Sequence, residues 1–217
     1  GILDNTIVLF FADHGDMMNG HGIRLKGTLP YDELYRIPCL LRLPASSDAV
    51  AGVPSGVTVD NIVSIVQLPT TLCRLAGIEP PAQFHHPDLV GLINGVAETA
   101  TPSVDLPASA ESPTPAYAEE LDEEAVFFEH YAAYWGVHPF YGVRTRHAKY
   151  VYYMNGEAEE LYLLDSDPYE LHNVADDPEY SDAKTRLKSA ADKWWRRTDG
   201  KSLEWYEENL FEPTARE

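Results

Sequence analysis

The sequence predicts an α/β fold in two parts, an α/β sheet region followed by a small antiparallel sheet that one helix covers. Residues Thr6–Phe11 read Thr-Ile-Val-Leu-Phe-Phe, a continuous apolar run that is typical of a strand buried on both faces. Between Asn61 and Leu75 the apolar residues recur at helical spacing. Short β-rich runs then precede an amphipathic segment, Glu179–Arg197, which we expect to be a covering helix.

The first part begins with the strand Ile7–Phe11, followed by a glycine-rich loop that extends to about Pro30. Tyr31–Tyr35 is long enough for one helical turn. A second apolar strand is predicted over Cys39–Leu43, and Pro44 stops it because proline cannot donate to a sheet ladder.

The next predicted element is the helix between Asn61 and Leu75. Asp60 or Asn61 suits its N-cap, and Gly77 suits the residue after its C-terminus. Pro69 removes a backbone donor, so it should bend this helix or split it.

A change of composition separates the two parts. Residues Ala97–Pro115 are rich in Ala, Ser, Thr and Pro, which indicates a linker or a surface loop. We therefore predict an α/β domain over residues 1–96, a linker or loop over 97–124 and an α+β subdomain over 125–217.

The second part consists of β-rich runs separated by turns. Asn155-Gly156 is a strong hairpin signal, and Asp165–Tyr169 reads as a turn before the final helix. The predicted strands are Val126–Glu129, Tyr141–Thr145, Lys149–Met154 and Glu160–Leu164.

Composition excludes some partners. The 217 residues carry a formal charge of -19, from 35 acidic and 16 basic residues, which argues against a nucleic-acid partner because phosphates are bound by Lys and Arg. No apolar run is long enough to span a membrane.

Cys39 and Cys73 each stand among apolar residues, so we expect buried free thiols. The start, Gly1-Ile-Leu, resembles neither a signal peptide nor an initiator, so a fragment of a longer protein is expected.

The polar loop after the first strand is where chemistry is expected, because α/β sheets bind ligands beyond the carboxyl ends of their strands. Asp13 follows the strand directly, and a carboxylate there must meet a cation, a hydrogen-bond network or solvent. A turn or helix-cap role for Asp13 is equally open from these residues alone. His14 by itself is compatible with a packed or solvent-facing imidazole, and Lys26 with a surface lysine.

Taken together, these residues resemble the sulfatase family of the alkaline phosphatase superfamily. The resemblance starts with Asp13-His14-Gly15-Asp16 and continues, in the family's order, through a series of shorter motifs. These motifs are His21-Gly22, Lys26, Tyr31-Asp32-Glu33 with Arg36-Ile37-Pro38, Gln67-Leu-Pro-Thr-Thr-Leu72 with Ala76-Gly77, Tyr141-Gly-Val-Arg-Thr145 with Lys149-Tyr150, and Glu160-Leu-Tyr-Leu-Leu-Asp165 with Asp167-Pro168, Glu170 and Asn173. The resemblance implies the C-terminal part of an alkaline-phosphatase-like sandwich, a mixed sheet flanked by helices.

The resemblance also implies roles for four residues. Asp13 would bind a divalent metal ion, and His14 would bind the same ion or contact the nucleophile or an ester oxygen. The ion is expected to be Ca²⁺, with Mn²⁺ or Mg²⁺ as alternatives, although imidazole suits Mn²⁺ or Zn²⁺ better than Ca²⁺. Lys26 would act in catalysis by binding the sulfate oxygens. His21 would either shape the loop or touch the substrate, and a set of C-terminal residues would either rim the pocket or lie on the sheet surface, namely His138, Arg144 and His147.

One motif of the family is missing. Sulfatases carry Cys or Ser followed by x-Pro-x-Arg, whose first residue becomes formylglycine, but Cys39 precedes Leu-Leu-Arg and Cys73 precedes Arg-Leu-Ala. The family's N-terminal pair of metal-binding aspartates is absent too, so these residues alone are expected to be inactive.

The expected function is metal-dependent hydrolysis of a small-molecule or carbohydrate sulfate ester, with the formylglycine in a missing N-terminal half. The alternatives are a phosphonate monoester or phosphodiester hydrolase of the same superfamily and an inactive, acidic binding paralogue. The family implies a periplasmic or secreted protein. Neither the ester nor the oligomeric state follows from the residues.

Overall fold

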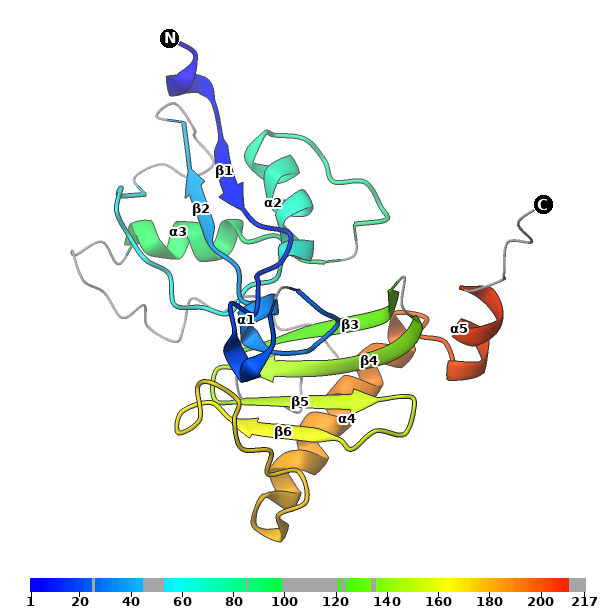
Figure 1. Ribbon diagram of the computed structural model, residues 1–217. Coiled ribbons are helices and arrows are strands. Elements are labelled where there is room, and N and C mark those ends of the chain that lie inside the picture. Colours follow the sequence, from blue (N-terminus) through cyan, green and yellow to red (C-terminus); the bar gives the residue numbers. More distant parts are fainter. Residues whose placement is uncertain are drawn as a thin grey trace. The chain divides into compact units, whose positions relative to one another are not determined.

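The computed structural model divides the chain into two compact units (Figure 1). The first unit comprises Gly1–Ala12 and Pro38–Pro115, and the second comprises Asp13–Ile37 and Ala116–Glu217. The structure describes residues 1–24, 26–44, 53–84, 86–98, 121, 124–133 and 136–210.

The first unit contains a two-stranded antiparallel sheet. Strand β1 (Val8–Phe11) pairs with β2 (Cys39–Arg42), with Val8 opposite Arg42 and Phe11 opposite Cys39. A short 3₁₀ turn, η1 (Leu3–Asn5), precedes β1. Both predicted strands are thus present.

Helical segments complete the first unit. The predicted helix begins later than expected, because residues 61–64 are not helical and Ser64, not Asp60 or Asn61, is the N-cap. A 3₁₀ turn, η4 (Ile65–Gln67), leads into α2 (Leu68–Leu75), which has Pro69 in its first turn. Gly77 has φ +70°, the left-handed conformation expected just after the helix. A further helix, α3 (Val90–Glu98), was not predicted.

The predicted linker lies almost wholly outside the described residues. Ala97 and Glu98 form the end of α3, and residues 99–120 are not described. The division at residues 97–124 therefore stays a prediction. Within the described residues, Asp13–Ile37 groups with the C-terminal sheet because its hydrogen bonds and ion pairs run to that sheet.

The prediction that the first strand is buried on both faces is wrong for this chain. Phe10 and Phe11 of β1 are 60% and 45% exposed, and Leu40 of β2 is 64% exposed. Among the described residues β1 has one neighbouring strand, and only Leu9 packs against a buried cluster. Cys39 is likewise exposed rather than buried, although both cysteines are free as expected.

The second unit is a four-stranded antiparallel sheet in the order β3-β4-β5-β6. Helix α4, which runs along one face of this sheet, begins after a 3₁₀ turn, η5 (Pro178–Tyr180), and α5 follows it (Figure 1). The predicted strands and the covering helix are confirmed, with the bounds β3 (Ala125–Ala133), β4 (Gly136–Thr145), β5 (Ala148–Tyr153), β6 (Glu160–Leu163), α4 (Ser181–Arg197) and α5 (Leu203–Asn209).

Side-chain alternation gives the two faces of this sheet different chemistry. Val143, Tyr150 and Leu161 point to the α4 face and form a core with Ala190 and Trp195. The residues next to them, including Arg144 and Lys149, point to the opposite face. There they meet the segment Asp13–Ile37, which contains the 3₁₀ turn η2 (Gly20–Gly22) and the short helix α1 (Asp32–Tyr35).

None of the helices in the described part of the chain combines the length and the apolar character needed to cross a lipid bilayer.

Candidate functional site

A backbone hydrogen bond joins the start of the segment Asp13–Ile37 to helix α1 near the end of that segment. The backbone N–H of Gly15 donates to the carbonyl of Leu34, at 2.8 Å. A Cβ at Gly15 would lie 1.8 Å from the carbonyl oxygen of Glu33, so only glycine allows this approach. The hydrogen bond places Asp13 and His14 beside α1.

The structure brings three of the four predicted site residues together. His14 Nε2 lies 3.1 Å from Lys26 Nζ and 3.8 Å from Asp13 Oδ2. The side chains of Asp13 and His14 are 88% and 40% exposed, so a ligand can reach both.

The surroundings of His14 select one tautomer. Its Nδ1 lies 2.6 Å from the carbonyl oxygen of Gly15, which can only accept, so Nδ1 carries the proton and donates it. The lone pair of Nε2 is then available to accept a hydrogen bond from Lys26 or to bind a metal ion. Metal-binding histidines commonly donate their other ring N–H to a backbone carbonyl in this way.

These donors fit part of a divalent metal site. Asp13 offers carboxylate oxygens and His14 offers one imidazole nitrogen, while Asp13 Oδ1 also accepts the N–H of His14 at 3.0 Å. Among the residues that the structure describes, no three His, Cys, Asp or Glu side chains gather closely enough to hold a metal ion. A complete coordination shell at Asp13 would therefore need donors beyond these.

His21 does not join the other three. Its ring stacks on Tyr31 with centroids 3.8 Å apart and planes 15° from parallel, and its backbone has a φ of 51°. This position matches a loop-shaping role better than substrate contact. Asp16, in turn, accepts the N–H of Met18 at 2.9 Å and so closes a tight turn.

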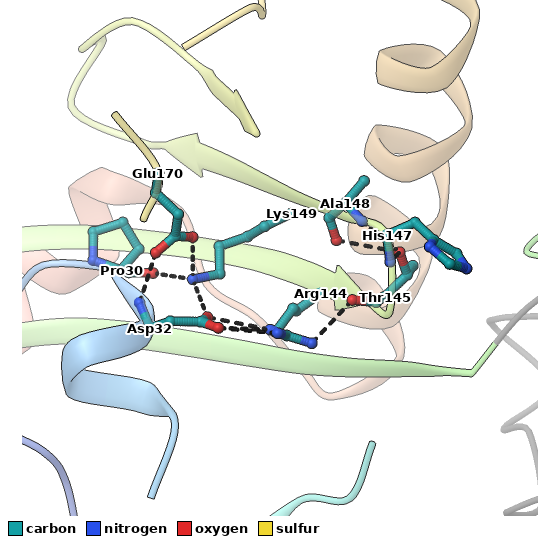
Figure 2. Close-up of polar contacts among 8 residues, drawn as sticks. All are labelled: Pro30, Asp32, Arg144, Thr145, His147, Ala148, Lys149 and Glu170. Atoms are coloured by element: carbon teal, nitrogen blue, oxygen red, sulfur yellow. Dashed lines mark hydrogen bonds and ion pairs between the residues drawn. The ribbon is translucent and has the colours of Figure 1, made fainter. Parts of the chain in front are cut away.

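A buried group of charges lies between helix α1 of the segment and strands β4 and β5 of the C-terminal sheet (Figure 2). Lys149 is 1% exposed, and its Nζ lies 2.6 Å from Asp32 Oδ1 and 2.5 Å from Glu170 Oε1. Arg144 donates from Nε and Nη2 to the carboxylate of Asp32, at 2.9 to 3.2 Å. We call Asp32, Arg144, Lys149 and Glu170 the ion cluster.

The two carboxyl groups of the ion cluster differ electrostatically. Burial opposes ionisation of Asp32, but the charges and hydrogen bonds of Lys149 and Arg144 outweigh it and lower the pKa of Asp32. Burial dominates at Glu170 and raises the pKa of that carboxyl, with Lys149 counteracting it in part.

Sequence reasoning did not find the ion cluster, although it quoted each member within a motif. Arg144 was expected to rim a pocket or to lie on the sheet surface, and the structure instead pairs it with Asp32. A signal was available: Lys149, Val151 and Tyr153 share one strand face, and a lysine on an apolar face requires a carboxylate partner. His147, the third of those candidates, pairs with Asp165 at 2.9 Å.

Comparisons with known proteins agree with these motifs. The model of the family "Sulfatase" matches residues 1–78, and the model "N-sulphoglucosamine sulphohydrolase, C-terminal" matches residues 108–196. Delta 4,5-hexuronate-2-O-sulfatase of Bacteroides thetaiotaomicron is 30% identical over 194 residues, which are 89% of this chain and 35% of that protein.

Solved structures give the same result. A putative sulfatase from Bacteroides thetaiotaomicron aligns with a TM-score of 0.70 at 28% identity, over 91% of this chain and 37% of that one. The phosphonate monoester hydrolase of Agrobacterium radiobacter aligns with a TM-score of 0.64 at 25% identity, over 93% of this chain and 36% of that one.

The chain thus spans a little over a third of the length of these relatives. Two sulfatase models match it in order, and its similarity to a sulfatase extends over nearly nine-tenths of its residues. The chain belongs to the sulfatase family of the alkaline phosphatase superfamily.

Proposed function

We propose that this protein is a metal-dependent sulfuric ester hydrolase and that this chain supplies part of its metal site and its sulfate-binding lysine. The observation that carries the proposal is the grouping of Asp13, His14 and Lys26, with 3.1 Å between His14 Nε2 and Lys26 Nζ. The nucleophile, a formylglycine, would come from a part of the protein that precedes these residues.

Each of the three residues has a distinct task in this proposal. Asp13 and the Nε2 lone pair of His14 would hold a divalent cation, Ca²⁺ or Mn²⁺, or else His14 would orient Lys26. The ammonium of Lys26 would bind the sulfate oxygens and stabilise the negative charge that grows as the ester bond breaks. When bound, the cation would polarise the ester and the formylglycine would supply the attacking oxygen.

A sulfated carbohydrate is the substrate class we favour. The matched relative from Bacteroides thetaiotaomicron is named for a hexuronate sulfate, and small-molecule sulfates are the other possibility. Because the described residues supply only part of the site, the choice depends on residues elsewhere in the protein.

The test uses the full-length enzyme and an aryl sulfate. Lys26→Ala should lower turnover by roughly 10²–10³-fold, the usual effect of removing one charge-stabilising donor, and should leave the metal content unchanged. Asp13→Asn should lower the metal content itself. The control is Lys201→Ala, which removes a lysine that pairs with Asp199 and should change neither quantity. Normal turnover in Lys26→Ala, or loss of its metal, would contradict the role of Lys26.

A second candidate is hydrolysis of phosphonate monoesters. The alignment with the phosphonate monoester hydrolase covers 93% of this chain, so the described fold alone fits either reaction. Rates on a matched pair of aryl sulfate and aryl phosphonate esters would decide between them. Reading the preceding coding sequence for Cys or Ser followed by x-Pro-x-Arg would test the proposed nucleophile.

A further inference from the structure

Three oxygen atoms surround the ammonium of Lys149. Besides its contacts with Asp32 and Glu170, Nζ donates to the carbonyl oxygen of Pro30 at 2.9 Å (Figure 2). The Pro30 carbonyl accepts a hydrogen bond, while the two carboxylates are ion-pair partners of the same ammonium. Burial to 1% exposure and these three partners together restrict the side chain to few conformations.

The ion cluster is balanced in charge. Lys149 and Arg144 are the cations, and Asp32 and Glu170 are the carboxylates that face them. Removing Lys149 would leave the buried carboxyl of Glu170 without its cation in the cluster, whereas removing Lys149 and the charge of Glu170 together would preserve the balance.

The hydrogen bonds and ion pairs that join the cluster to the backbone and side chains of the segment Asp13–Ile37 include those at Pro30 and Asp32. The side chain of Asp32 receives Arg144 and Lys149, the backbone N–H of Asp32 donates to Glu170 Oε2 at 2.7 Å, and the carbonyl of Pro30 receives Lys149. The cluster therefore fastens these residues to strands β4 and β5 and to the loop after β6.

Lys26 is linked to that attachment through the chain, and Asp13 and His14 are linked to it through a hydrogen bond. Lys26 lies four residues before Pro30, and α1, which starts at Asp32, holds Asp13 and His14 through the hydrogen bond from Gly15 to Leu34. The attachment of Pro30 and Asp32 therefore helps to hold the segment that carries all three site residues, together with the ring contacts of Tyr31 and Tyr35 with the sheet.

We propose that Lys149 and Glu170 are positioning residues, which touch no substrate and hold the segment carrying Asp13, His14 and Lys26 in its working geometry. This inference rests on the proposed function for the site, and it adds to the machinery one residue of β5 and one of the loop after β6. It gives a role to a lysine buried on a sheet face where an apolar residue would pack without needing a charged partner.

The test compares Lys149→Met with Lys188→Met in the full-length enzyme. Methionine keeps an unbranched stem, and Lys188 of α4 is a control lysine that also pairs with a carboxylate, Glu159, but is more exposed and lies away from the segment. In Lys149→Met, hydrogen exchange should accelerate in peptides from residues 13–37 and stay slow in α4, and kcat/KM should fall by about 10²-fold, the usual effect of a small misplacement. Lys188→Met should leave the exchange of residues 13–37 and kcat/KM unchanged.

A double variant separates positioning from general stability. Lys149→Met with Glu170→Gln restores the charge balance, so the melting temperature should recover relative to Lys149→Met alone. Activity and the protection of residues 13–37 should stay low, because Pro30 and Asp32 still lack the ammonium. If Lys149→Met does not fold, the double variant is compared with Lys188→Met and the unaltered enzyme instead.

Three results would overturn the inference: normal exchange over residues 13–37 in a folded Lys149→Met, normal kcat/KM in that variant, or a double variant that regains both. If the unaltered enzyme hydrolyses neither ester, the proposed function fails while the exchange comparison still decides whether Lys149 holds the segment.

Discussion

The two sheets of this protein are made of similar residues in opposite environments. In the first unit, Phe10 of β1 is 60% exposed and Leu40 of β2 is 64% exposed. In the second unit, Phe140 of β4 is 1% exposed and Tyr150 of β5 is completely buried. The second sheet has α4 on one face and residues of the segment Asp13–Ile37 on the other, whereas the described part of the first unit has a single pair of strands.

The difference teaches what an apolar strand does and does not predict. The apolar run from Ile7 to Phe11 indicates that the strand is suited to a buried position. Whether the strand is buried depends on the elements that cover it. The chain spans about 35% of the length of its sulfatase relative, and we propose that elements beyond these residues cover β1 and β2 in the full-length protein.

The largest expected change in the free energy of unfolding comes from removing the ring of Phe140. Its ring contacts His130 and Tyr153, with centroids 5.3 and 5.6 Å away, so alanine would leave a cavity. Phe140→Ala should lower the free energy of unfolding of the second unit by about 3–5 kcal/mol. Urea unfolding followed by tryptophan fluorescence measures it, since Trp194, Trp195 and Trp205 lie in that unit. A change below about 1 kcal/mol would mean that this face is not a packed core.

The next effect is electrostatic and depends on pH. Asp32→Asn removes the charge that Arg144 and Lys149 share, so it should cost about 1.5–3 kcal/mol at neutral pH. The pKa of Asp32 is lowered in the folded state, so its charge stabilises the fold above the unfolded value of about 3.9. That contribution disappears as the pH falls through the lower, folded pKa.

Urea titrations of both proteins between neutral and acid pH test this. The stability difference between the unaltered protein and Asp32→Asn should be constant down to about pH 4 and then shrink. A difference that grows on acidification would show that the shift has the opposite sign.

A smaller effect is expected at Tyr141, on the α4 face. Its hydroxyl donates to Asp192 Oδ1 of α4 at 2.7 Å, while its ring stacks on Trp195. Tyr141→Phe keeps the stacking and removes the hydrogen bond, so the free energy of unfolding should fall by about 1 kcal/mol. The same fluorescence assay measures it, and an unchanged value would mean that the ring alone fixes α4 at this point.

The same contrast explains which parts of the fold were predictable. Strands β3 to β6 and α4 follow from local patterns, namely alternation, the Asn155-Gly156 turn and helical spacing, because these are properties of neighbouring residues. Helix α3 was missed because Gly91, Asn94 and Gly95 are poor helix formers and its stability comes from packing, with Leu92 only 4% exposed.

The sequence allowed us to predict which residues belong to the candidate site better than how these residues are arranged. The family resemblance selected Asp13, His14 and Lys26, and the structure places the last two within hydrogen-bonding distance. The ion cluster was not predictable, because Asp32 and Lys149 are 117 positions apart and no local pattern joins them. Such contacts depend on the packing of the segment Asp13–Ile37 on the sheet.

The smallest change in stability is expected at Phe10, the exposed phenylalanine of β1 that we compare with the buried Phe140 of β4. An exposed phenylalanine has little buried area to lose, so Phe10→Ala in the 217-residue chain should change the free energy of opening β1 and β2 by no more than about 0.5 kcal/mol. Amide hydrogen exchange of Val8–Phe11 and Cys39–Arg42 measures this locally, which tryptophan fluorescence cannot, because the tryptophans belong to the second unit. In the full-length protein the same substitution should cost several times more if further elements cover this sheet, because Phe10 would then occupy a core. An equally small effect in both forms would mean that β1 remains at the surface and that its apolar run has another use.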